Sequence, residues 1–170
     1  MIGLRAFTEF TGNFFGGVYM KNFQFHFSLP GLLAFLLVML PNLFWFAVPA
    51  ANDVLRADSV TPGLDAAASV CQVLLAAALV ALENRTAGPF PRKKALAFSA
   101  AAALGGYYLA WGLYYCGSAG GPVILSLALL PCAALLLFAL DRKNWFALAF
   151  TAVFTGCHLL ASVKNFLPGG

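Results

Sequence analysis

The sequence predicts an all-α polytopic membrane protein, in which five transmembrane helices form a bundle and an amphipathic helix precedes them at the membrane interface. Its 170 residues are 62% hydrophobic and only 9% charged, whereas a soluble domain usually carries about 25% charged residues. The stretch from Phe27 to Pro49 is predominantly apolar and has no charge. It is as long as the roughly 20-residue helix that a 30 Å hydrocarbon layer requires. Composition therefore excludes a soluble fold, and this stretch defines the first span.

Four more apolar runs follow, separated by loops that contain charges, prolines or glycines. We place the five spans at about Leu29–Val48, Leu64–Leu82, Ala95–Cys116, Pro122–Leu140 and Trp145–Val163. The connections between them are too short for an extramembrane domain. Two parts result, an interfacial segment over residues 1–27 and a transmembrane bundle over residues 28–170.

The interfacial helix is predicted from apolar residues that recur every three or four positions, a spacing that gathers them on one helix face. These residues are Leu4, Phe7, Phe10, Phe14 and Val18. Residues 22–27 then alternate polar and aromatic side chains, which suits a chain passing through the lipid headgroup layer.

The distribution of Lys and Arg predicts the orientation of the bundle, because cytoplasmic loops of membrane proteins carry an excess of both. One side holds eight, namely Arg5, Lys21, Arg85, Arg92, Lys93, Lys94, Arg142 and Lys143, and the other holds Arg56 and Lys164. We therefore expect a cytoplasmic N-terminus, an external C-terminus and a multi-pass location in a bacterial cytoplasmic membrane. The net charge of +4 is explained by this topology and does not indicate binding to nucleic acid.

A candidate ligand site is predicted from polar and aromatic residues that share a depth in the outer half of the membrane. They are Asn42, Gln72, Tyr107, Trp111 and His158. Polar side chains within lipid are costly and usually face the bundle interior or a water-filled cavity. Pro41 and Pro131 interrupt two spans at a comparable depth, and each frees a backbone carbonyl that can shape a cavity. The alternative is that these residues only hold helices together through hydrogen bonds.

Other features of the spans have structural interpretations. Gly105 and Gly106, with Ala101 and Ala102 one turn earlier, indicate a seam where two helices pack closely. Tyr114 and Tyr115 are typical of the aromatic belt at a membrane surface. The four cysteines form no C-x-x-C pair and suit helix packing.

These observations order the function classes. The leading hypothesis is a protein that binds or translocates a small apolar or aromatic solute through a pocket in the outer half. The second is a structural or assembly subunit of a membrane complex without its own ligand, and the third is an intramembrane enzyme acting on a lipid. No acidic residue lies in the interior of a span, since Asp65 and Glu83 are at the ends of the second one, and neither histidine has partners at metal spacing. We therefore predict no catalytic residues, no metal and no cofactor. The expected partners are the lipid bilayer, a small-molecule ligand, and either further copies of the chain or a membrane subunit.

Short motifs are spread across residues 22–161. They are F-H-F before the first span, L-P-N within it, a third span rich in Tyr and Trp, G-P-V at the start of the fourth, and G-C-H-L in the fifth. In this order the chain resembles a family of small uncharacterised bacterial multi-span membrane proteins. The resemblance implies the fold and the membrane location but no activity. That family often has an acidic residue one turn before the position of Gln72, where this chain has Ala68 and Ser69.

Overall fold

The computed structural model describes residues 22–88 and 90–167, and it contains five long helices. They are α2 (Leu29–Ala47), α3 (Pro62–Ala81), α4 (Lys94–Tyr115), α5 (Gly121–Asp141) and α6 (Trp145–Phe166). Each is long and apolar enough to cross a membrane. The five predicted spans are confirmed, with ends that differ by at most three residues, and the chain is a multi-pass membrane protein. The predicted interfacial helix lies outside the described residues.

Local sequence signals set the helix ends. The Ser28 hydroxyl accepts a hydrogen bond from the Gly31 N–H at 3.2 Å and so caps α2. In the same way the Asn144 side-chain oxygen accepts from the Ala147 N–H at 3.1 Å and caps α6. Proline occupies the first turn of α2, α3 and α5, where a backbone N–H has no partner within the helix.

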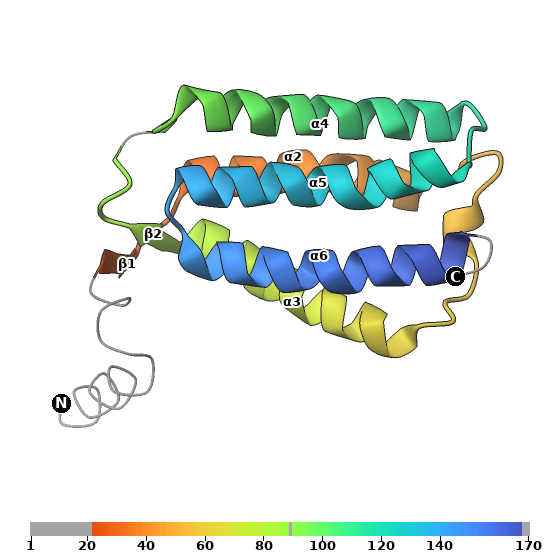
Figure 1. Cartoon of the computed structure of the whole chain (residues 1–170), viewed down its shortest axis with the longest axis horizontal. Coiled ribbons are helices and arrows are strands. Elements are labelled where there is room, and N and C mark those ends of the chain that lie inside the picture. Colours follow the sequence, from red (N-terminus) through yellow and green to blue (C-terminus); the bar gives the residue numbers. More distant parts are fainter. Residues whose placement is uncertain (1–21, 89, 168–170) are drawn as a thin grey trace.

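Four of the helices form a row of antiparallel neighbours in the order α4, α5, α6, α3 (Figure 1). Helix α2 lies against one face of this row and contacts α3, α4 and α5. Because the helices alternate in direction, the connections gather at the two ends of the bundle. We call these the Arg142 end, with residues 82–93 and 142–144, and the Asp53 end, with residues 48–61 and 116–120.

The positive charges divide between these ends as the sequence predicts for a membrane protein. Within the described residues, the Arg142 end holds Arg85, Arg92, Lys93, Lys94, Arg142 and Lys143, and the Asp53 end holds Arg56 and Lys164. The fold therefore has a strongly basic end and a weakly charged one.

Two features at the Arg142 end were not predicted. Strand β1 (Phe23–Phe25) pairs antiparallel with β2 (Leu82–Asn84), which joins the segment before α2 to the end of α3 (Figure 1). Gly31 approaches the Leu79 carbonyl so closely that a side-chain carbon at this position would collide with it. Helices α2 and α3 are therefore in backbone contact at this end. At the Asp53 end, α2 and α3 are connected by a loop that contains the 3-10 turn Val54–Arg56.

Tyrosines of α4 hold α2 in place. Pro41 has no N–H, so the Leu37 carbonyl one turn earlier lacks its helical donor, and the Tyr108 hydroxyl donates to that carbonyl at 2.8 Å. The other tyrosine contacts to α2 and its following loop are Tyr107 with Asn42, Tyr114 with Asp53 and with the Leu55 N–H, and Tyr115 with the Val48 carbonyl. Tyr114 is fully buried, so its interpretation as a belt residue at the membrane surface is wrong.

Candidate functional site

A cavity of about 280 Å³ lies within the bundle, and all five helices contribute side chains to its wall. Four of the five predicted ligand-binding residues line it, and they come from four different helices. These are Asn42 on α2, Gln72 on α3, Tyr107 on α4 and His158 on α6. The arrangement brings together residues that are up to 116 positions apart in the sequence.

Asn42 and Tyr107 form a polar pair that joins two helices at the cavity wall. The Asn42 amide donates to the Tyr107 hydroxyl at 2.9 Å and to the Val38 carbonyl of its own helix at 3.3 Å. The Tyr107 side chain is buried. Both amide protons of Asn42 are thus used by the protein, and the amide plane is fixed by α2 and α4 together.

Gln72 and His158 face the same space with weaker support. The Gln72 amide donates to the Met39 sulfur at 3.1 Å, which is a weak acceptor. The His158 ring stacks on Phe154, with a centroid distance of 5.1 Å and an interplanar angle of 12°. Within residues 22–88 and 90–167, no hydrogen bond joins the imidazole nitrogens to another residue.

The cavity wall therefore retains hydrogen-bonding capacity that the described part of the chain does not use. It comprises the side-chain carbonyl oxygens of Asn42 and Gln72 and the ring of His158. Among the described residues that form the wall, none is Asp, Glu, Lys or Arg. This wall is chemically suited to a neutral molecule that offers N–H or O–H groups to the two carbonyl oxygens.

Trp111 does not line the cavity. It lies one turn beyond Tyr107, where its ring packs 5.6 Å from that of Tyr114 and 6.4 Å from that of Trp45. Its indole N–H is buried and has no hydrogen-bond acceptor among the described residues. The structure thus places Trp111 in the packed layer between the cavity and the Asp53 end.

Several wall residues were not singled out from the sequence. Met39, Ser69 and Phe154 line the cavity, and each lies three or four positions from a predicted site residue. Helical periodicity was the signal that could have found them. Of the two prolines, Pro131 is part of the wall and Pro41 is not.

The cavity opens between α2 and α3. Phe46 on α2 and Ser69 on α3 are exposed wall residues, and α3 is inclined relative to the other helices (Figure 1). Toward the Arg142 end, the buried side chains of Val38, Leu75 and Leu135 close the cavity. Access is therefore through the gap between these two helices.

A carboxylate at the Asp53 end is held by four donors. Asp53 accepts hydrogen bonds from the Trp45 indole at 2.8 Å, the Arg56 guanidinium at 2.7 Å and the Tyr114 hydroxyl at 2.9 Å, and from the Ala50 N–H at 3.3 Å. Desolvation alone would raise the pKa of this carboxyl, but the hydrogen bonds outweigh it and the pKa is lowered from its usual value. The cluster fixes the loop after α2 to α4.

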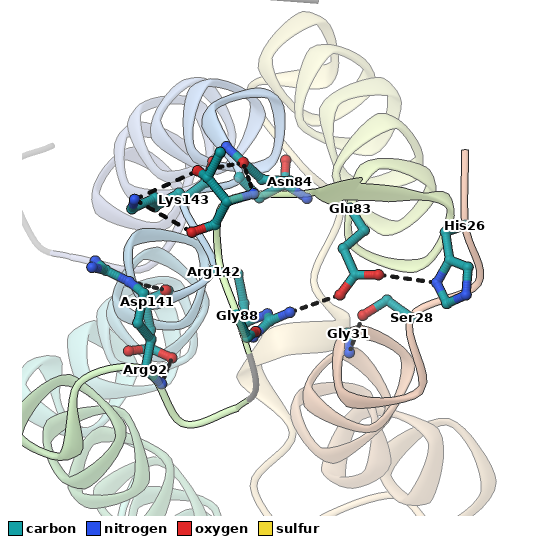
Figure 2. A network of polar contacts seen from close by, with 12 residues as sticks. His26, Ser28, Gly31, Glu83, Asn84, Gly88, Arg92, Asp141, Arg142 and Lys143 are labelled. Carbon is teal, nitrogen blue, oxygen red and sulfur yellow. Dashed lines mark hydrogen bonds and ion pairs between the residues drawn. The ribbon is translucent and has the colours of Figure 1, made fainter. Parts of the chain in front are cut away.

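The Arg142 end carries a second polar network (Figure 2). Glu83 accepts from the Arg142 guanidinium at 2.8 Å and lies 3.0 Å from His26 Nδ1 on its other side. Asp141 accepts from the backbone N–H groups of Arg92 at 2.9 Å and Lys93 at 2.6 Å. Each of these carboxylates has structural partners, which favours a role in joining β1, β2 and the start of α4.

Within residues 22–88 and 90–167, no group of three or more His, Cys, Asp or Glu side chains is placed so that it could hold a metal ion.

Comparisons with protein-family models, with curated proteins and with solved structures found no match to this chain.

Proposed function

We propose that this protein binds a small neutral solute, aromatic or largely apolar with at least one N–H or O–H group, in the cavity between its five helices. One observation carries the proposal. Asn42, Gln72, Tyr107 and His158, which the sequence predicts to share a depth in the membrane, line one cavity from four helices.

The wall supports this class of solute. A charged ligand would have to enter without a fully charged partner, because the described wall residues include no Asp, Glu, Lys or Arg. Aromatic side chains, including Phe35, Trp45 and Phe154, supply flat apolar contacts around the polar groups. The volume of about 280 Å³ is just below the roughly 300–1,000 Å³ of drug-sized sites, so the occupant is small.

The proposed direction of access follows from the charges. The basic Arg142 end faces the cytoplasm by the positive-inside rule, so the cavity receives its solute in the outer half of a bacterial cytoplasmic membrane. Translocation would require Val38, Leu75 and Leu135 to separate.

Equilibrium binding of indole to the detergent-solubilised protein tests the proposal, since indole offers one N–H donor on an aromatic ring. Gln72→Ala is expected to weaken binding roughly 3- to 10-fold, the range for one lost hydrogen bond, and His158→Ala is expected to weaken it through the loss of an aromatic ring from the cavity wall. Val73→Ala and Leu160→Ala are matched controls on the same two helices, because both residues are exposed on the lipid side. Their affinity for indole should equal that of the wild type.

Equal affinities in all five proteins would contradict the proposal. If Gln72→Ala and His158→Ala instead lowered only the stability of the bundle, the polar layer would serve helix packing. An assembly role would then be the better interpretation, and a stoichiometric membrane subunit should co-purify with the chain.

A further inference from the structure

A second hollow lies on the other side of α2, as a groove of about 380 Å³ between α2 and α4 with α5 as its floor. Its wall is apolar apart from Asp141 at the Arg142 end. Val38 and Leu135 belong to the walls of both hollows, so they separate the groove from the candidate solute site.

The groove exists because α4 presents small side chains to α2. Ala97, Ala100 and Ala101 line it together with Leu33 and Leu37 of α2. The alanine methyl groups of α4 and the leucine side chains of α2 therefore lie on opposite sides of the groove.

The sequence predicts a closely packed seam at Gly105 and Gly106, with Ala101 and Ala102 one turn earlier. Gly106 packs closely against α5, because a carbon added there would lie 3.1 Å from Leu130 Cδ1, whereas nothing lies within 4 Å of a carbon added to Gly105. Ala101 lines the groove instead of forming a helix contact.

The length of the groove corresponds to one leaflet of a bilayer. Its α2 wall runs from Leu29 to Val38, a rise of about 14 Å at 1.5 Å per residue, which is close to half of a 30 Å hydrocarbon layer. A single acyl chain from the leaflet at the Arg142 end would lie along it.

The end of the groove is basic. Lys94 lies three positions before Ala97 and seven before Ala101, so it continues their face of α4. Arg92 and Lys93 precede it directly. The backbone N–H of Arg92 (Figure 2) and that of Lys93 both donate to the Asp141 carboxylate. Within the described residues, Lys93 and Lys94 are exposed and neither forms an ion pair.

The charge balance at this end favours an anion. Three cationic residues, Arg92, Lys93 and Lys94, follow one another here, and the nearby Asp141 carboxylate is fully buried and already accepts two backbone hydrogen bonds. The Arg92 guanidinium donates to the Asp141 backbone carbonyl at 3.0 Å. The neighbouring Arg142 pairs with Glu83 and adds no net charge.

From the apolar groove and its basic end, we propose that this site holds an anionic phospholipid. One acyl chain fills the groove between α2 and α4, and the phosphate lies at Arg92, Lys93 and Lys94. The site differs from ordinary contact with lipid because it selects the headgroup as well as the chain.

Native mass spectrometry of the full chain tests this, with phosphatidylglycerol and phosphatidylcholine of identical acyl chains added in turn. We expect one phosphatidylglycerol per chain and weaker retention of phosphatidylcholine. Lys93→Gln/Lys94→Gln should weaken phosphatidylglycerol binding by roughly 5-fold for each lysine replaced and leave phosphatidylcholine unchanged. Arg85→Gln is the matched control, because Arg85 is a basic residue at the same end that follows β2 and does not belong to the basic run at the start of α4.

A second variant tests the groove itself. Ala101→Phe is expected to displace both lipids, because its side chain would fill the space beside Leu33 and Leu37. Equal retention of the two lipids by the wild type would overturn the proposal. So would a phosphatidylglycerol affinity that Lys93→Gln/Lys94→Gln leaves unchanged, or one that Arg85→Gln lowers by the same factor.

Discussion

Pro41 shows how a single residue in a transmembrane helix requires a partner from elsewhere in the fold. Its missing N–H leaves the Leu37 carbonyl without a helical donor, and lipid offers no replacement. The Tyr108 hydroxyl supplies one from α4. The proline thereby links α2 to α4 at the depth of the candidate site.

A double-mutant cycle tests this link. Tyr108→Phe should lower the free energy of unfolding in detergent by about 0.6–2 kcal/mol, the range for a hydrogen bond between transmembrane helices. In a Pro41→Ala background the same change should cost little, because an alanine in place of the proline restores the backbone donor to Leu37. If Tyr108→Phe lowered the free energy of unfolding equally in both backgrounds, the Tyr108 hydroxyl would not act through the Leu37 carbonyl.

Asp53 gives a prediction for pH dependence. Because its pKa is lowered in the folded protein, its contribution to stability is fully present above the unfolded-state pKa of about 3.9. That contribution is lost as the pH falls through the lower folded-state pKa. We expect Asp53→Asn to be less stable than the wild type at neutral pH, and the difference in melting temperature should shrink below about pH 4.

Thermal unfolding of both proteins in detergent across about pH 3 to 7, which spans these pKa values, measures this difference. Asp58→Asn is the control, because no hydrogen bond or ion pair to the Asp58 side chain is found within residues 22–88 and 90–167. An Asp53→Asn difference that stays constant across the acid range would contradict the role of the charged carboxylate.

At the scale of helices and strands, the sequence determines most of what the structure shows. All five spans follow from long apolar runs bounded by charges, prolines or glycines, since a helix in lipid has few alternatives. The shared depth of Asn42, Gln72, Tyr107 and His158 also follows from counting residues along each span.

What the sequence could not reveal depends on rotation and on long-range pairing. Trp111 lies on the same helical face as Tyr107, but one further turn carries it past the cavity into the layer beneath Trp45. Strand β1 lies within residues 22–27, whose alternation of polar and aromatic side chains predicts a chain passing through the headgroup layer instead of a strand. Strand β2 is three residues long, too short for an alternating pattern to be detected. The groove beside Ala101 was not predicted. Small side chains allow close packing only where a second helix lies against them, and the sequence does not show which face of α4 has such a neighbour.

The approach of α2 to α3 can be tested with one methyl group. Gly31→Ala should destabilise the protein by about 2–3 kcal/mol, because the new carbon meets a backbone carbonyl that cannot move aside as a side chain would. Gly156→Ala on α6 is the matched control, since nothing lies within 4 Å of the added carbon. It should leave stability unchanged or raise it slightly. Equal thermal unfolding of the two variants would mean that the helices are not in backbone contact at Gly31.

For the whole molecule, the division of charge between the two ends predicts the orientation in the membrane. Cys116 is exposed at the Asp53 end, which we expect to face outward. A membrane-impermeant maleimide should therefore label the protein in intact spheroplasts, and Cys116→Ala should abolish that labelling.

The opposite end provides the counterpart. Arg85→Cys in a Cys116→Ala background should react only after the membrane is permeabilised. The reverse pattern in intact spheroplasts is that the Arg85→Cys variant is labelled and Cys116 of the wild type is not. It would reverse the proposed orientation and place the candidate site in the inner half of the membrane.

The most direct test of the proposed solute site is native mass spectrometry of the protein as released from its membrane, under mild activation. We predict one small non-lipid molecule on each wild-type chain, retained in Val73→Ala and lost in Gln72→Ala. A wild-type chain that carries no such molecule, or an adduct that Gln72→Ala leaves unchanged, would contradict the proposal that this cavity binds a solute.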